Sequence, residues 1–168
     1  TAYEIKECDW SSDVCSSDLK IMSNPGAATT VSIHPIQLGS NQALRLIAVV
    51  KGLSLAAAGD TTASVITTSS YVPTQVVIAN ANNAGANVDV SAVQVGVYPA
   101  ASQGGTSILT AAALTSMTTQ TYVKVSNASN PNTAQTAQTL YFNVGGTTTT
   151  ATADVYVYGY DLSGPQTN

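Results

Sequence analysis

Short runs in which valines alternate with other residues are the feature that most limits what this chain can fold into. Near the end of 88–98, Val93, Val95 and Val97 fall on one side of an extended chain. The run at 153–160 shows the strongest alternation. Turn-forming segments separate such runs at roughly 8–12 residues, and no long helical periodicity lies between them. We therefore predict an all-β protein, an antiparallel β-sandwich, with a jelly roll as the favoured type.

Two further apolar segments are less distinctive. The segment 44–50 is apolar throughout except for Arg45, which fits a buried strand or a short helix, and its valines favour a strand. The segment 108–114 is rich in alanine, so both a strand and a short helix remain open. The other segments predicted as strands are 62–67, 74–79, 122–125 and 140–144, with a weaker signal at 29–33.

The first nineteen residues differ from the rest in composition. They hold both cysteines, the only tryptophan and five of the nine acidic residues. The run 8–19 resembles the translation of a DNA sequencing-library adapter, and 1–5 resembles the translation of its other end. We accordingly interpret 1–21 as a non-native artefactual head, 22–59 as an N-terminal arm with one or two strands, and 60–168 as the β-sandwich core.

Charged side chains are scarce outside this head. The chain is 8% charged, against about 25% in typical soluble domains. A hydrophobic content of 44% supplies a core, so the composition is not that of a disordered chain. A surface with little net charge favours self-association, although a monomeric extracellular β domain also fits. After residue 19, four basic residues balance four acidic ones: Lys20, Arg45, Lys51 and Lys124 against Asp60, Asp89, Asp154 and Asp161.

This charge distribution also bears on partners. Four scattered basic residues cannot form a track that neutralises phosphates, so we expect no nucleic-acid binding. The sequence has no run of about 18 apolar residues, so we expect no membrane span.

The alternation assigns side chains to the two faces of each strand. We predict that the aliphatic sets point into the core, and that the residues between them point outward. The predicted core residues are Val93, Val95, Val97, Val123, Val125, Leu140, Phe142, Val144, Val155 and Val157. Six tyrosines share the opposite register and form a candidate interface: Tyr98, Tyr122, Tyr141, Tyr156, Tyr158 and Tyr160.

Three interpretations of these tyrosines stay open. Their rings could cover an outer sheet face, since cross-strand aromatic pairs stabilise sheets by roughly 0.2–1 kcal/mol each. They could form a subunit contact, because tyrosine is enriched at interfaces. They could also form a sugar-binding platform, but the sequence places no persuasive cluster of Asp, Asn or Arg beside them.

The sequence offers little catalytic chemistry. His34 is the only histidine and has no evident partner, and no nucleophile-elbow pattern surrounds any serine. Asp60 and Asp161 are typical of turns, and Asp89 and Asp154 of strand edges. We predict that the protein is not an enzyme, and we expect no catalytic residue, no metal site and no cofactor.

Several segments between residues 71 and 162 resemble small structural proteins of tailed bacteriophages. They are 76–81, 95–101, 104–106, 140–145 and 153–160. The resemblance implies a β-sandwich virion component, such as a head-decoration or other capsid-associated protein, with no catalytic residues. It implies localisation in the virion, assembled in the bacterial cytoplasm, with a second copy of the chain and a major capsid protein as partners. The alternative is a glycan- or receptor-binding module of the adhesin or fibre type.

Overall fold

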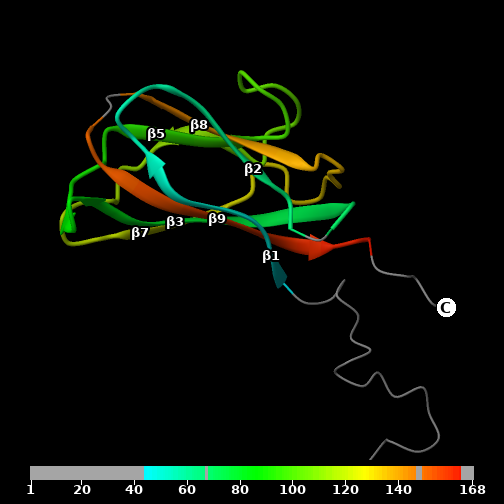
Figure 1. Ribbon diagram of the computed structural model, residues 1–168. Coiled ribbons are helices and arrows are strands. Elements are labelled where there is room, and N and C mark those ends of the chain that lie inside the picture. Colours follow the sequence, from blue (N-terminus) through cyan, green and yellow to red (C-terminus); the bar gives the residue numbers. More distant parts are fainter. Residues whose placement is uncertain (1–43, 67, 147–148, 164–168) are drawn as a thin grey trace, which may run out of the picture. The chain divides into compact units, whose positions relative to one another are not determined.

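The described part of the chain consists of strands and their connections. The computed structural model describes residues 44–66, 68–146 and 149–163, and these residues contain no helix. The described strands form two antiparallel sheets that pack face to face (Figure 1). The prediction of an all-β antiparallel sandwich is confirmed. The strands are β1 (Leu44–Ser54), β2 (Gly59–Ser64), β3 (Tyr71–Asn83), β4 (Ala86–Asn87), β5 (Val93–Tyr98), β6 (Leu109–Ala113), β7 (Val123–Asn127), β8 (Thr139–Gly146) and β9 (Thr152–Asp161).

The two sheets combine strands that are distant in the sequence. Sheet A has the order β1-β9-β3, and β3 also pairs with β7 along 75–79 and with β4 at 82–83. Sheet B has the order β2-β8-β5-β6. The chain therefore crosses repeatedly from one sheet to the other. In the described residues no helix is long and apolar enough for a membrane crossing.

The interior between the sheets is filled mainly by aliphatic side chains. Burying a side chain of this kind stabilises the fold by roughly 1.5–3 kcal/mol. The inward sets predicted for β5, β8 and β9 are confirmed, because each member is at most 3% exposed: Val93, Val95, Val97, Leu140, Phe142, Val144, Val155 and Val157.

Strand β1 is a full member of sheet A. It pairs with β9 over most of its length, and a bulge at Ile47 lets Ile47 and Ala48 both face the interior. Leu53 from the same strand is also buried. This strand lies inside the range 22–59 that the sequence assigns to an arm. The predicted head (1–21) and the possible strand at 29–33 lie outside the described residues.

Strand β7 shows that one face assignment was wrong. Val123 and Val125 were predicted to be core residues, but they are 46% and 55% exposed. Between them Lys124 is half-buried, and its Nζ donates to the carbonyl of Ala113 on β6 at 2.7 Å. The alternation predicts two faces but cannot say which is inner. At this sheet edge, the aliphatic part of the Lys124 side chain covers the rim of the core, while its ammonium group donates to the Ala113 carbonyl.

Candidate interaction surface

Three of the six candidate tyrosines come together on β9. Tyr156, Tyr158 and Tyr160 alternate with Val155 and Val157, which are fully buried. Because side chains alternate along a strand, the three rings lie in a line on the outer side of sheet A. The predicted outward register of these three residues is therefore confirmed.

The antiparallel register places aliphatic side chains on both sides of this line. Tyr156 lies directly between Val49 of β1 and Val77 of β3, and Val77 pairs in turn with Val125 of β7. Residues that are directly opposite in antiparallel strands project from the same face. We call the resulting surface the apolar face; its members are Leu44, Leu46, Val49, Val72, Gln75, Val77, Val123, Val125, Tyr156, Tyr158 and Tyr160.

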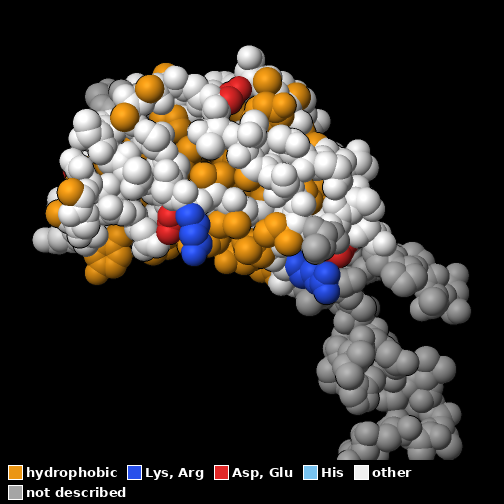
Figure 2. Space-filling model, viewed as in Figure 1, with side chains coloured by type: hydrophobic (Ala, Val, Ile, Leu, Met, Phe, Trp, Pro, Cys, Tyr) orange, Lys and Arg blue, Asp and Glu red, His pale blue; other side chains and the backbone are white. Residues whose placement is uncertain are grey.

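Much of the apolar face is open to solvent. Leu44 and Tyr160 are 51% and 39% exposed, and Val123 and Val125 are the exposed residues of β7. Figure 2 shows hydrophobic side chains gathered along the side of the molecule where Figure 1 places β1 and β9. Monomeric proteins rarely expose contiguous apolar patches larger than a few hundred Å². The apolar face is therefore the candidate site of this protein.

The acidic side chain at one end of this face is Asp154 on β9. Its carboxylate accepts hydrogen bonds from the Gly52 amide at 2.9 Å, Asn80 Nδ2 at 2.8 Å and the Tyr156 hydroxyl at 3.3 Å. Desolvation raises the pKa of Asp154, but these hydrogen bonds and the charge of Lys51 outweigh it, so the pKa lies below its ordinary value. Desolvation and the neighbouring Asp154 charge raise the pKa of Tyr156. The carboxylate is thus held within the protein's own hydrogen bonds.

Asp161, the last residue of β9, lies in the inward register of the strand, where it pairs with the buried Tyr71. Asp161 is 4% exposed, and its carboxylate accepts from Arg45 at 3.1 Å and from the Thr68 hydroxyl at 2.6 Å. Desolvation raises the pKa of Asp161, whereas hydrogen bonds from Ser163 and Thr68 and the charge of Arg45 lower it, and the net shift is downward. The cluster fixes the end of β9, where the Leu162 amide donates to the Ser70 carbonyl at 2.8 Å.

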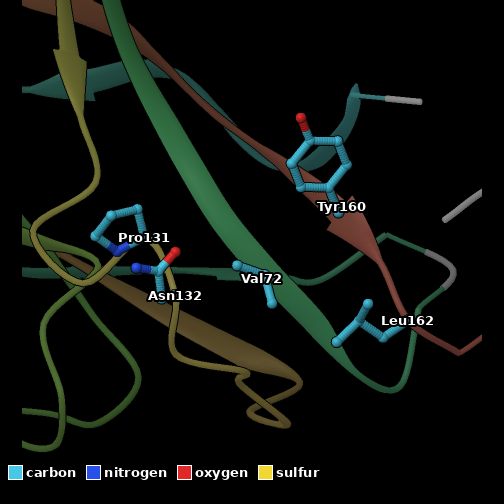
Figure 3. A pocket seen from close by; sticks show the side chains of 5 residues that line it. All are labelled: Val72, Pro131, Asn132, Tyr160 and Leu162. Carbon is cyan, nitrogen blue, oxygen red and sulfur yellow. The ribbon is translucent and has the colours of Figure 1, made fainter. Parts of the chain in front are cut away.

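A pocket opens beside Tyr160, near the end of β9. It has a volume of about 430 Å³ and is lined by Val72, Pro131, Asn132, Tyr160 and Leu162. Figure 3 shows Val72 between Tyr160 on one side and the loop with Pro131 and Asn132 on the other. Because Val72 pairs with Tyr160 in sheet A, the pocket continues the apolar face. Its lining suits a small apolar group better than a charged one.

Sheet B buries a tyrosine that was predicted to lie in the exposed set. Tyr98 is only 5% exposed, so it does not belong to a free surface. Its ring lies over Gly96, where a Cβ would come within 2.6 Å of Cε2, and its hydroxyl accepts from the Ala111 amide at 2.9 Å. The neighbouring Tyr141 is half-buried opposite Tyr98. Both residues are therefore separate from the tyrosines of β9.

Tyr122 stands apart from the other five candidates. It precedes β7, is 49% exposed, and accepts a hydrogen bond from the Asn80 amide through its carbonyl at 3.0 Å. The six predicted residues thus divide into three on the apolar face, two on sheet B and one beside β7.

Sequence reasoning missed most of the aliphatic members of the apolar face. One signal was present in the run 44–50, because a strand that is apolar on both faces is expected to be covered on both. For Val77 and Val125 no such signal existed, since their juxtaposition with Tyr156 depends on strand order and register.

The predicted acidic residues are dispersed. Asp60 lies in β2, Asp89 accepts from the Ser91 amide in a turn, and Asp154 and Asp161 lie towards opposite ends of β9 and in opposite registers. The hydrogen bonds from Ser91 lower the pKa of Asp89. Within the described residues, no group of three or more His, Cys, Asp or Glu side chains is arranged to hold a metal ion. His34 lies outside the described residues.

Comparison of the chain with protein-family models, with curated proteins and with solved structures finds no match.

Proposed function

We propose that this chain is a non-enzymatic structural protein of a tailed-bacteriophage virion, either a capsid decoration or another capsid-associated component. It acts by self-association and by binding a lattice of major capsid protein. The observation that carries the proposal is the apolar face, an uncharged aromatic and aliphatic surface on one side of a β-sandwich. Aromatic residues enriched on a surface with charges only at its margin are typical of subunit contacts.

We also propose that the sandwich is a jelly roll. Setting aside the two-residue β4, the order β1-β9-β3-β7 faces the order β2-β8-β5-β6. Each sheet thus interleaves early and late strands, which is the arrangement expected of eight strands wound as two Greek keys. A jelly roll suits the proposed role, since viral capsid domains are among the proteins that use it.

Self-association is tested with the full chain in solution. Sedimentation velocity over a wide concentration range is expected to show a reversible oligomer. Tyr158→Lys, which puts a charge in the centre of the apolar face, is expected to shift the chain to monomer. The matched control Thr110→Lys lies at an exposed position of β6 in sheet B and is expected to leave the oligomer intact. A strict monomer at every concentration would contradict self-association.

The virion assignment has its own test in the DNA that flanks the gene. Portal, protease or major-capsid genes beside it would support the assignment, and the neighbouring capsid protein could then be assembled for co-sedimentation with this chain. Flanking metabolic genes, together with no binding to such particles, would contradict it.

The line of tyrosines on β9 favours one further candidate, a glycan-binding module. Aromatic rings can stack on sugars, and the three rings are in register on one strand. A glycan array distinguishes the two functions, because binding that is lost in Tyr156→Ala or Tyr158→Ala would support the module and would weigh against an interface between copies.

A further inference from the structure

We propose that the edge of β7 pairs with the edge of β7 in a second copy, so that sheet A continues from one molecule into the next. The two strands run antiparallel about a two-fold axis at Val125. This contact joins strand edges through their backbones and does not stack one sheet face on another. It rests on the proposed function only in taking a second copy of the chain as the partner.

One side of β7 presents backbone groups that are unpaired within the described residues. β7 lies at the margin of sheet A, where β3 is the strand that pairs with it (Figure 1). The Ala128 amide donates to the Thr74 carbonyl of β3 at 2.8 Å. Because hydrogen-bonded residues alternate along an antiparallel strand, Lys124 and Ser126 also bond to β3. Three residues therefore direct their N–H and C=O groups away from β3: Val123, Val125 and Asn127.

Two of the other edge strands are protected against pairing, as strand edges in native proteins usually are. β1 is interrupted by two bulges and carries the exposed Lys51. On β6 the Thr110 amide donates to Ser129 Oγ at 2.8 Å, and the Ala113 carbonyl accepts from Lys124 at 2.7 Å. Neighbouring side chains thus occupy backbone groups of β6 that a further strand would need.

β7 lacks these protective features. It pairs with β3 without a bulge and contains neither proline nor glycine. Its only charged side chain, Lys124, is directed to β6 and does not shield the edge, whereas Val123 and Val125 are exposed beside it. The remaining edge strand, β2, exposes Asp60 and threonines, so pairing there would cover little apolar surface. A regular edge with exposed valines is the kind that pairs with another strand.

The residue pattern of β7 fits a second copy of the same strand. When Val125 lies opposite Val125 of the second copy, Val123 lies opposite Asn127, and every outward backbone group has a partner. Lys124 then lies opposite Ser126. Moving the axis to Lys124 would place the two lysines directly opposite each other and leave Asn127 unpaired, and like charges in that position are destabilising. One register is therefore favoured by both hydrogen bonding and charge.

This contact is small, and main-chain hydrogen bonds supply most of its affinity, as in other cases of strand addition. We therefore expect a weak and reversible dimer. Concentrated protein, or a surface that holds many copies close together, favours such a contact.

The first test uses disulfide formation in the full chain with Cys8 and Cys15, its only cysteines, replaced by serine. In the proposed register the Cα atoms of the two Val125 residues are about 5.5 Å apart, which suits a disulfide. Val125→Cys is therefore expected to form a covalent dimer under mild oxidation.

Val123→Cys is the matched control for this test. Val123 has a similar exposure on the same face of β7, but in the proposed register its Cα lies about 14 Å from that of Val123 in the second copy. The control is expected to stay monomeric. Cross-linking of Val123→Cys in place of Val125→Cys would overturn the proposed register.

The second test blocks the edge without a disulfide. Val125→Pro removes an N–H that points away from β3, so it is expected to keep the fold and to weaken dimerisation by about tenfold or more. Thr62→Pro on β2 is the matched control. Its N–H also points outward, because the Val65 amide donates to the Gln138 carbonyl of β8 and hydrogen-bonded residues alternate.

The control Thr62→Pro is expected to change the dissociation constant of the dimer by less than about twofold. Sedimentation velocity at high protein concentration measures the association, and thermal unfolding checks that both proline variants fold. A folded Val125→Pro protein that associates like the wild type would overturn the proposal.

A combined variant separates this inference from the proposed function. Tyr158→Lys changes β9, two strands away from the edge of β7, and is expected to leave the disulfide of Val125→Cys intact, because oxidation traps even a weak contact. Loss of that disulfide in Tyr158→Lys would refute the edge pairing. Oligomers that depend on Tyr158 and tolerate Val125→Pro would keep the proposed self-association and also refute it. A dimer through β7 that binds no capsid particle would support the inference and contradict the virion role.

Discussion

The outer faces of the two sheets differ in how much of them the chain itself covers. On sheet B, Asp60 accepts from the Ser102 amide at 2.7 Å and from Asn143 Nδ2 at 2.7 Å, and Gln103 donates to Asn143 at 2.9 Å. These bonds hold the loop 99–105 against sheet B, where Tyr98 is buried. On sheet A, Tyr156, Tyr158 and Tyr160 remain at least partly exposed, and the Asp154 carboxylate, beyond Tyr156 in the same register, accepts from the Gly52 amide.

The comparison shows that a tyrosine's role depends on what covers it. Tyr98 is covered by its own chain, so its ring belongs to the stability of the monomer. The tyrosines of β9 lie among exposed aliphatic side chains, so covering them from outside would bury further apolar area. The first arrangement stabilises the fold, and the second leaves an apolar surface partly open to solvent.

The largest difference in unfolding free energy is expected between a tyrosine substitution on sheet B and one on sheet A. Tyr98→Ala is expected to cost about 3–5 kcal/mol of unfolding free energy, because it empties a buried site and leaves the Ala111 amide without its partner. Tyr158→Ala is expected to cost about 1 kcal/mol or less when the protein is dilute enough to be monomeric. Urea unfolding measures both, and equal losses would contradict the distinction.

A smaller loss of stability is expected from replacing the buried Asp161 at the end of β9. Asp161→Ala is expected to cost about 1–3 kcal/mol at neutral pH, since Thr68 and Arg45 lose a buried acceptor. Thermal unfolding measures this loss. Asp161→Asn keeps the size of the side chain and serves as the matched variant.

The lowered pKa of Asp161 also predicts how the stability of the protein changes in acid. The folded-state pKa of Asp161 is lowered, so its contribution is fully present above the unfolded-state pKa of about 3.9 and disappears as pH falls through the folded-state value. The melting temperature of the wild type is therefore expected to fall below about pH 4, and to fall less steeply in Asp161→Asn. Identical slopes would contradict this role, although Asp154 contributes in the same direction.

A smaller loss of stability is expected when the contact that holds the loop 99–105 on sheet B is removed. Asp60→Ala removes the acceptor for the Ser102 amide and is expected to cost about 0.5–1.5 kcal/mol. Hydrogen exchange is expected to increase in 99–105 and to stay unchanged in β9. Unchanged exchange in the loop would show that other contacts hold it in place.

The smallest change in stability is expected on β7, where the sequence predicted Val125 to be buried and the structure places it on the exposed face. Val125→Lys is expected to change the unfolding free energy of the monomer by less than about 0.5 kcal/mol, because the side chain is 55% exposed. Val155→Lys, at a fully buried position of β9, is the control and is expected to prevent folding. A loss of several kcal/mol in Val125→Lys would restore the core role that the sequence pattern first indicated.

Regular alternation was a good predictor where a strand is central. β8 and β9 each pair on both sides, and their inward residues follow directly from the period of two. At the edge strand β7 the same rule identified the two faces but reversed them, because Lys124 covers the rim there. Periodicity fixes which residues share a face, and only packing decides which face is buried.

The turn between β3 and β4 was harder to predict from the sequence. The stretch 80–87 consists of asparagine, alanine and one glycine and has no alternation of apolar residues, yet β3 continues into it and returns as β4 through a turn at Ala84 and Gly85. Both turn residues have positive φ, 50° and 86°, which is typical of tight hairpins but uncommon for alanine. The sequence therefore gave little warning of the hairpin.

The amino-acid sequence determined the fold class, the inward residues of the central strands and the alignment of three tyrosines on β9, because these follow from local alternation along single strands. The apolar face and the burial of Tyr98 were decided by the tertiary structure. Val49, Tyr156, Val77 and Val125 come from four strands, and only strand order and register bring them together. Tyr98 has the same alternation as the others, but its ring lies over Gly96 and its hydroxyl accepts from the Ala111 amide on β6, and such contacts leave no periodic trace in the chain.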